Sequence, residues 1–222
     1  MTKHEAVGVD IGGTGIKAGL VDLERGLLIS ERVRVSTPAG AKPADVLAAV
    51  RQVLDTLGVA DQRISLGVAF PAIVKHGRTL SAANVSDDWI GFEAEKFFED
   101  GLARDIAFVN DADAAGVAEA RFGAARGQQG LTIVTTLGTG IGSAFLYNGV
   151  LVPNTELGHL LRKGHSVERW AAYSAKERDD LGWDAWAERL QWFYSHVEFL
   201  FSPVLLVVGG GVSKHATEFL PL

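Results

Sequence analysis

The hydrophobic residues of this chain fall into short apolar runs that alternate with amphipathic stretches. Apolar and β-branched residues fill 6–11 and 17–22 on either side of a glycine-rich turn, and the run 29–35 predicts a third strand. The segment 44–57 predicts a helix, because its valines and leucines recur on one face at helical spacing. Further expected elements are strands at 64–70, 106–109, 131–137, 143–147 and 204–208 and helices at 112–122 and 184–201. Strands that alternate with helices in this way indicate an α/β fold.

The turn between the first two expected strands occurs a second time. The tetrapeptide Gly-Thr-Gly-Ile stands at 13–16, within DIGGTGIKAGLV, and again at 138–141, within TLGTGIGSAFL. We expect the glycines to supply the positive φ that tight hairpin turns require. The repeated strand, turn and strand indicate two related halves, residues 1–109 and residues 110–222, and the first of these is the expected N-terminal actin-like half.

Both turns suit the binding of phosphate. A glycine turn exposes backbone N–H groups, threonine adds a hydroxyl donor, and a nearby lysine adds a point charge. Asp10 ends the first strand, where its carboxylate could hold Mg²⁺ through water. Neither turn has the spacing of a phosphate loop or of a dinucleotide-binding motif. The candidate phosphate-binding residues are Asp10, Gly12, Gly13, Thr14, Gly15, Lys17, Gly138, Thr139 and Gly140.

Composition narrows the class of protein. The chain has 222 residues, of which 47% are hydrophobic, and 21 basic against 27 acidic residues give a net charge of −6. This balance argues against bulk binding to nucleic acid or to an anionic membrane. No cysteine is present, so we expect neither disulfides nor a thiolate zinc site. No apolar run approaches the roughly 20 residues of a membrane span, and the first residues do not read as a secretory signal. We therefore expect a cytoplasmic protein.

Asn110 and Asp111 follow an expected strand at its carboxyl end, where open α/β sheets place ligands. An amide beside a carboxylate suits a sugar hydroxyl, because Asn110 can fix the hydroxyl while Asp111 accepts its proton. The alternative is structural: Asp111 caps the helix that starts at Ala112. Asp113 lies in the first turn of that helix, where its charge complements the helix dipole, and we assign it no chemical role.

Five ordered motifs resemble those of the ROK family of sugar kinases. They are DIGGTGIK, NDADAAG, TLGTGIGSAF, VPNTELGH and VVGGGVS, and they span nearly the whole chain. SAANVSDDWIG and HVEFLFSP resemble in particular the polyphosphate glucokinase and polyphosphate/ATP-glucomannokinase branch of that family. The resemblance implies an α/β fold with two RNase H-like (actin/hexokinase-like) halves around a central cleft. It also implies transfer of phosphate from polyphosphate or ATP to the 6-hydroxyl of glucose, with Mg²⁺.

The resemblance carries over to individual residues. It favours Asp111 as the general base over the capping role, and it implies sugar contacts from Asn84, Asn110, Asp111, Glu156, His159 and Glu168. Gly209 and Gly210 correspond to a glycine motif on the nucleotide side, although any α/β fold could use such a turn to enter a helix. Many ROK kinases carry a cysteine-rich zinc motif after the histidine, and this chain has none there. The family's closing strand and helix after Leu222 are also absent, which leaves the activity of the chain open.

Alternatives to a polyphosphate glucokinase remain at this point. An ATP-dependent kinase for glucose, mannose or an N-acetylated hexosamine fits the same motifs, and so does a non-catalytic, sugar-sensing ROK protein. An actin- or chaperone-like ATPase is disfavoured by Asn110, Asp111, Glu156 and His159. The aromatic residues of 184–201 exceed what one core-facing stripe needs, so we expect a homodimer. Lys17, Lys75, Arg162, Lys163 and Lys214 are candidates for a polyphosphate path, and the sequence does not choose among them.

Overall fold

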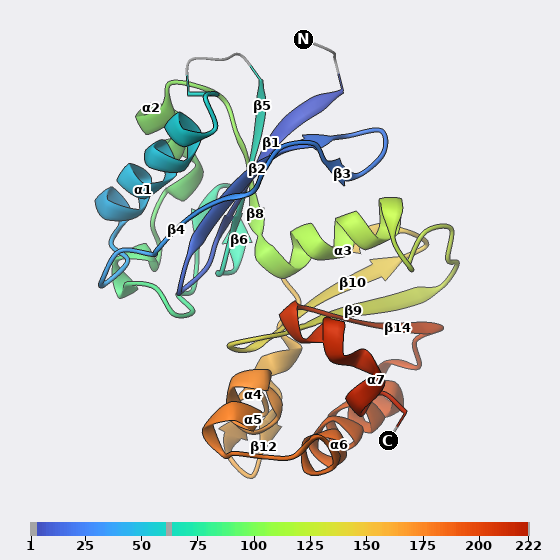
Figure 1. Ribbon diagram of the computed structural model, residues 1–222. Helices are drawn as coiled ribbons and strands as arrows, with labels where there is room; N and C mark the ends of the chain where they lie inside the picture. Colours follow the sequence, from blue (N-terminus) through green and yellow to red (C-terminus); the bar gives the residue numbers. More distant parts are fainter. Residues whose placement is uncertain (1–3, 61–63, 222) are drawn as a thin grey trace. The chain divides into compact units, whose positions relative to one another are not determined.

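A computed structural model describes residues 4–60 and 64–221 of the chain (Figure 1). Its contacts divide the chain into two units between Ala114 and Ala115, inside the helix α3 (Asp111–Phe122). Each unit has its own mixed sheet and its own hydrophobic core. The expectation of an α/β fold is therefore confirmed.

The sheet of the first unit has the strand order β3-β2-β1-β5-β8, and β4 pairs with β2. Its first two strands form an antiparallel hairpin in which Ile11 lies opposite Ile16, so the first glycine turn closes this end. β5 then pairs with β1, and β8 with β5, in parallel. The strands are β1 (Glu5–Ile11), β2 (Ile16–Asp22), β3 (Leu27–Leu28), β4 (Val33–Val35), β5 (Ser65–Phe70) and β8 (Ala107–Asn110).

The expected continuous strand at 29–35 is wrong. The chain instead forms the short strands β3 and β4, separated by residues 29–32. Ser30 explains the break, because its hydroxyl accepts a hydrogen bond from the N–H of Leu20 at 2.9 Å and donates to the carbonyl of Glu31 at 2.9 Å. A side chain that occupies backbone groups in this way competes with the sheet ladder.

Helices and a small hairpin complete the first unit. Its aromatic core centres on Trp89, whose ring stacks on Phe98 at 5.9 Å and lies 4.5 Å from the ring of Phe70. The buried indole N–H of Trp89 donates to the carbonyl of Ala41 at 2.8 Å, so burial leaves no unmet donor there. The elements are α1 (Pro43–Thr56), α2 (Ala94–Leu102), the 3₁₀ helix η1 (Asp87–Trp89) and the hairpin of β6 (Val74–Lys75) and β7 (Arg78–Thr79).

The sheet of the second unit repeats this plan in the order β11-β10-β9-β14. β9 and β10 form an antiparallel hairpin in which Leu137 lies opposite Ile141, and the second glycine turn joins them. β14 pairs with β9 in parallel, as β5 pairs with β1 in the first unit. The strands are β9 (Leu131–Leu137), β10 (Ile141–Tyr147), β11 (Val150–Val152) and β14 (Leu205–Gly209). The repeat read from the sequence is therefore a repeat of structure.

The long helix α6 (Trp183–Phe201) supplies much of the core of the second unit through Trp186, Leu190, Phe193 and Val197. The remaining elements are η2 (Leu157–His159), β12 (Leu161–Arg162), β13 (His165–Ser166), α4 (Glu168–Ala171), α5 (Tyr173–Arg178), η3 (Gly211–His215) and α7 (Ala216–Phe219). Among the residues that the structure describes, no helix is long and apolar enough to cross a membrane.

Gly210 joins β14 to η3 in a conformation that only glycine adopts readily. Its φ is 88° and its ψ is 175°. A Cβ at this position would also lie 2.6 Å from the backbone nitrogen of Leu137, at the start of the second glycine turn. This glycine thus lets the end of β14 lie against the end of β9.

We expect Gly210→Ala to lower the free energy of unfolding by about 1–3 kcal/mol from backbone strain alone, with the steric clash in addition. Gly211→Ala is the matched control, because a Cβ at that position would have no atom within 4 Å and its φ is not positive. Urea denaturation of both variants measures the difference. Equal midpoints would contradict this account of Gly210.

Candidate functional site

The first glycine turn is closed by other parts of the same unit. The N–H of Gly12 donates to the carbonyl of Gly15 at 3.1 Å, and the hydroxyl of Thr37 donates to the carbonyl of Gly12. A Cβ at Gly13 would lie 2.7 Å from the Cβ of Asn84, the expected sugar residue. None of the glycines of this turn has a positive φ, so that expectation is wrong. Glycine is needed here for close approach, because any side chain on Gly13 would displace Asn84.

Asp10 and Lys17 lie opposite each other on β1 and β2, and their side chains form an ion pair of 2.8 Å. Both side chains keep substantial exposed surface, 49% for Asp10 and 38% for Lys17. The sequence assigned the carboxylate to Mg²⁺ and the ammonium to phosphate. In the structure the carboxylate and the ammonium bind each other, so the pair carries almost no net charge before any ligand binds.

The second glycine turn is held in a similar way. The N–H of Gly138 donates to the carbonyl of Gly140 at 3.0 Å. Ser174, the second residue of α5, donates its hydroxyl to the carbonyl of Thr139 at 2.6 Å and its N–H to the carbonyl of Gly138 at 3.1 Å. Two carbonyls of the turn are therefore engaged by one serine. Gly210 packs against Leu137 beside this turn, so the third glycine motif adjoins the second.

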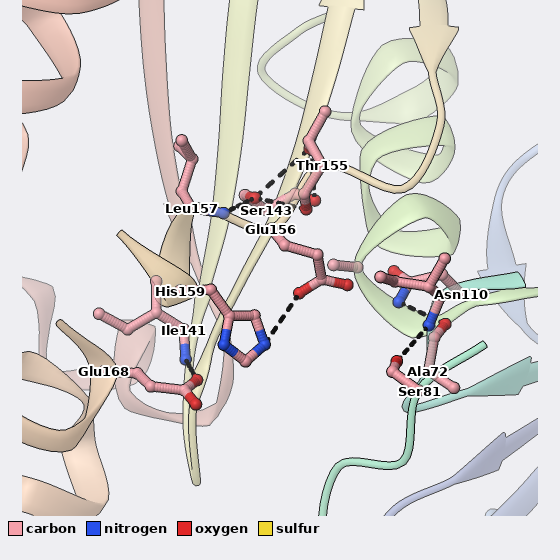
Figure 2. Close-up of polar contacts among 12 residues, drawn as sticks. Ala72, Ser81, Asn110, Ile141, Ser143, Thr155, Glu156, Leu157, His159 and Glu168 are labelled. Carbon is pink, nitrogen blue, oxygen red and sulfur yellow. Dashed lines mark hydrogen bonds and ion pairs between the residues drawn. The ribbon is translucent and has the colours of Figure 1, made fainter. Parts of the chain in front are cut away.

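The contacts of Asn110 and Asp111 show which of these two residues caps α3. Asn110, and not Asp111, caps α3, because its Oδ1 accepts from the N–H of Asp113 at 3.0 Å. Its Nδ2 donates to the carbonyl of Ala72 at 2.9 Å, which fixes the amide (Figure 2). Asp111 is then the first residue of the helix, and its Oδ1 lies 2.8 Å from the N–H of Ala112. Asn110 performs the capping role, so the Asp111 carboxyl does not need to.

Burial raises the pKa of the Asp111 carboxyl from 3.8 to about 6. The hydrogen bond from Ala112 opposes this shift, while the negative charges of Asp10 and Asp113 add to it. The residue as a whole is exposed, although protein atoms crowd its carboxyl. A carboxyl with a pKa close to neutral is suited to accept a proton from an alcohol.

Glu156, His159 and Glu168 lie near one another in the second unit (Figure 2). Nε2 of His159 lies 3.8 Å from Oε2 of Glu156, and the carboxylate of Glu168 accepts from the N–H of Ile141 at 3.2 Å. A Cβ at Gly140 would lie 2.5 Å from Oε2 of Glu168, and one at Gly158 would lie 3.0 Å from it. Glu168 therefore lies against both the second glycine turn and the turn that carries His159.

A buried serine anchors the segment that carries Glu156. Ser143 on β10 donates its hydroxyl to the carbonyl of Thr155 at 2.7 Å and accepts from the N–H of Leu157 at 3.0 Å. The hydroxyl of Thr155 donates back to the carbonyl of Ser143 at 2.9 Å. The residues on both sides of Glu156 are thus fixed to the sheet, which limits where its carboxylate can lie.

Comparison with known proteins finds similar sequences over most of the chain. The model of the ROK family matches residues 6–169. The chain belongs to the ROK family. It is 41% identical over 222 residues to the polyphosphate glucokinase of Mycobacterium tuberculosis, a match that covers 100% of this chain and 83% of that protein.

Solved structures of ROK proteins agree in fold. The inorganic polyphosphate/ATP-glucomannokinase of Arthrobacter sp. strain KM is similar with a TM-score of 0.94 and 50% identity, over 99% of this chain and 88% of that one. A ROK family glucokinase of Streptomyces griseus, solved in complex with glucose and AMPPNP, gives a TM-score of 0.80 and 25% identity, over 95% of this chain and 84% of that one. The actin/hexokinase-like α/β fold implied by the motifs is confirmed.

Each unit of this ROK chain carries part of the expected site. Asn84, Asn110 and Asp111 belong to the first unit with one glycine turn, and Glu156, His159 and Glu168 belong to the second with the other. Sequence reasoning missed Thr37 and Ser174, which hold the turns. Nothing in the sequence marks them, because each lies in another part of the chain and acts through a single hydroxyl.

Of the cations considered for a polyphosphate path, Arg162 is engaged in packing. Its guanidinium lies 3.5 Å from the ring centre of Trp170 on α4 and 5.2 Å from that of Trp192 on α6. Such stacking suits the flat guanidinium and holds the β12–β13 hairpin to the two helices. Arg162 is therefore explained as a structural contact.

The raised pKa of Asp111 predicts that Asp111→Asn stabilises the protein more at pH 8 than at pH 4. A carboxyl whose pKa is raised on folding contributes its stability below the unfolded value of 3.8 and loses it as pH rises through about 6. Asparagine does not ionise and so avoids that loss. Thermal unfolding of both proteins across this range measures the effect.

Asp184→Asn is the matched control, because it makes the same chemical change in the first turn of α6 at an exposed position. A stability difference between Asp111→Asn and the wild type that does not vary with pH would contradict the raised pKa.

Proposed function

We propose that this ROK protein is a polyphosphate-dependent glucokinase, which transfers phosphate from inorganic polyphosphate, and also from ATP, to the 6-hydroxyl of glucose. The observation that carries the proposal is the Asp111 carboxyl, which belongs to an exposed residue, has a raised pKa and is free of the capping role that Asn110 fills. The relatives support the choice of donor and sugar, since one is a polyphosphate glucokinase and another a polyphosphate/ATP-glucomannokinase.

The sugar is proposed to bind through Asn84, Asn110, Asp111, Glu156, His159 and Glu168. Asp111 accepts the proton of the 6-hydroxyl as that oxygen attacks the terminal phosphorus. One O–P bond forms, the bridging P–O bond of the donor breaks, and the shortened polyphosphate or ADP leaves with the electron pair. The amide of Asn110 is fixed by hydrogen bonds to Ala72 and Asp113, and it therefore fixes the position of the neighbouring Asp111.

The donor phosphates are proposed to bind backbone N–H groups of the two glycine turns other than those of Gly12 and Gly138, which donate within the turns. Gly209 and Gly210 are proposed to lie beside the second group of donors. Thr37 and Ser174 support this role, because they engage carbonyls of the turns and so orient the peptide groups. Fixed donors of this kind need no reorganisation when charge develops on the transferred phosphate, which is how electrostatic catalysis works in phosphoryl transfer.

Mg²⁺ is proposed to bind together with the donor. Within the described residues, no group of three or more His, Asp or Glu side chains could form a protein-only cage. The carboxylate of Asp10 has one oxygen on Lys17 and a second that suits a water of a hydrated ion, a set that fits magnesium held mainly by phosphates. When bound, Mg²⁺ would neutralise charge on the donor phosphates.

A cytoplasmic homodimer is proposed as the state of the protein. Phe199, near the end of α6, is 83% exposed, and its neighbours Leu200 and Phe201 are 49% and 38% exposed. Apolar groups gathered in this way favour a protein contact.

Two alternative functions remain, an ATP-dependent hexose kinase and a sugar-sensing protein without activity. The first differs from the main proposal in the donor used, and the second in having no turnover.

A coupled assay for glucose 6-phosphate tests the function directly. With purified protein, glucose and Mg²⁺, we expect product with polyphosphate as the sole donor and also with ATP. Mannose and N-acetylated hexosamines serve as alternative acceptors. Product with ATP alone would contradict the polyphosphate assignment and keep the kinase, whereas no product with either donor would favour the sugar-sensing protein.

Replacing the base should remove turnover and spare binding. We expect Asp111→Asn to lower kcat by roughly 10²–10⁴ while glucose still binds, because only the proton acceptor is lost. In the wild type, kcat/KM should fall as pH drops below about 6, where Asp111 becomes protonated. Initial rates across pH and calorimetric titration with glucose measure both effects. Turnover close to that of the wild type in Asp111→Asn would remove Asp111 from this role.

A further inference from the structure

A guanidinium lies directly on the first glycine turn. A Cβ at Gly15 would lie 2.7 Å from Nε and 3.1 Å from Nη2 of Arg34, so the guanidinium touches the Cα face of this glycine. Arg34 belongs to β4, which pairs with β2 (Figure 1). It is far from the glycine turn in the sequence and belongs to no motif, so sequence patterns do not point to it.

The sheet register places Arg34 in a row of charged residues. Asp10 lies opposite Lys17 on the neighbouring strand, and Lys17 lies opposite Arg34 on the next. Residues directly opposite in antiparallel strands project from the same face of the sheet. Arg34 therefore lies on the face that carries Asp10, whose charge also acts on Asp111.

The charges of this row do not balance. The ion pair of Asp10 and Lys17 accounts for one charge of each sign. Within the described part of the chain, no carboxylate lies in ion-pair distance of the Arg34 guanidinium, which leaves one positive charge at the turn. Like charges placed directly opposite in a sheet are destabilising, so Lys17 beside Arg34 costs stability. A bound anion would relieve that cost.

We propose that Arg34 binds a phosphate group of the donor at the first glycine turn. This inference rests on the proposed function and extends its donor site by a residue from β4. The flat, forked guanidinium matches two oxygens of one phosphate, and it lies against Gly15 of the turn. The neutral pair of Asp10 and Lys17 would attract an anion weakly, and Arg34 supplies the net positive charge.

The contact also gives a reason for glycine at position 15. Its φ is not positive, so an alanine there is not excluded by the backbone. The atoms that an alanine Cβ would meet are the end of a flexible side chain and can move away. Gly15→Ala should therefore fold and displace the guanidinium from the turn.

Arg34→Met tests the proposal. We expect the KM for linear polyphosphate to rise by about 10-fold to 100-fold, the range for loss of one hydrogen-bonded charge, while the KM for glucose stays the same. Arg34→Lys, which keeps the charge and loses the fork, should be intermediate. The melting temperature of Arg34→Met should equal or exceed that of the wild type, because the repulsion with Lys17 is removed.

Arg25→Met is the matched control. It removes the same charge from an exposed position in the turn after β2, about 20 Å from the glycine turn along a strand of this length. If the KM for polyphosphate rises equally in Arg25→Met and Arg34→Met, the effect comes from the net charge of the protein, and the proposal is overturned. An unchanged donor KM in Arg34→Met would overturn it as well.

A double-mutant cycle adds an independent readout. If Gly15→Ala acts by displacing Arg34, its effect on the donor KM should be smaller in the Arg34→Met background than in the wild type. Fully additive effects would show that the guanidinium is not at the phosphate.

Calorimetric titration with linear polyphosphate separates this inference from the proposed function, since it requires no turnover. Tighter binding by the wild type than by Arg34→Met, with a steeper decline as salt is added, supports Arg34 as a phosphate ligand even if glucose is not the acceptor. Equal affinity of the two proteins overturns the inference even if the wild type phosphorylates glucose.

Discussion

The structure depends on close backbone approach at its two glycine turns. In each hairpin the strands end at a turn where another segment lies where a side chain would be: Asn84 on Gly13, and Glu168 on Gly140. A hydroxyl from outside the hairpin then binds a turn carbonyl, from Thr37 in one unit and from Ser174 in the other. Glycine is therefore needed at these positions because neighbouring segments lie close to its Cα, and not because the backbone has a positive φ there. A side chain at these positions would displace Asn84 and Glu168, two residues of the proposed sugar site.

Several features of the site cost stability in the absence of ligand. The Asp111 carboxyl is crowded and near like charges, which raises its pKa, and Lys17 stands opposite Arg34 on adjacent strands. Both arrangements are unfavourable for the folded protein alone, and the proposed proton transfer and phosphate binding would relieve them. Functional sites are where such local conflicts are expected, because binding and catalysis need groups that are not already satisfied.

At the start of α3, Asn110 has the structural role of capping the helix, and the neighbouring Asp111 has the proposed chemical role. Asn110 uses both ends of its amide, one for the helix cap and one for Ala72, and it thereby fixes the start of the helix. Asp111 follows as the first helical residue, and its carboxyl is not needed for the cap. An aspartate in place of Asn110 could accept from Asp113 but could not donate to Ala72. The amide at 110 and the carboxylate at 111 are therefore not interchangeable.

The α/β class, the repeated hairpin and the placement of Asn110 and Asp111 at a strand end can all be predicted from the order of residues, because they follow from local periodicity. The folded chain was needed to establish that Asp10 pairs with Lys17, that Asn110 is the cap, that Ser30 breaks the strand expected at 29–35 and that Arg34 lies on Gly15. Most of these contacts depend on which segments meet and in what register. Register brings together residues that are distant in sequence, and local pattern carries no record of it.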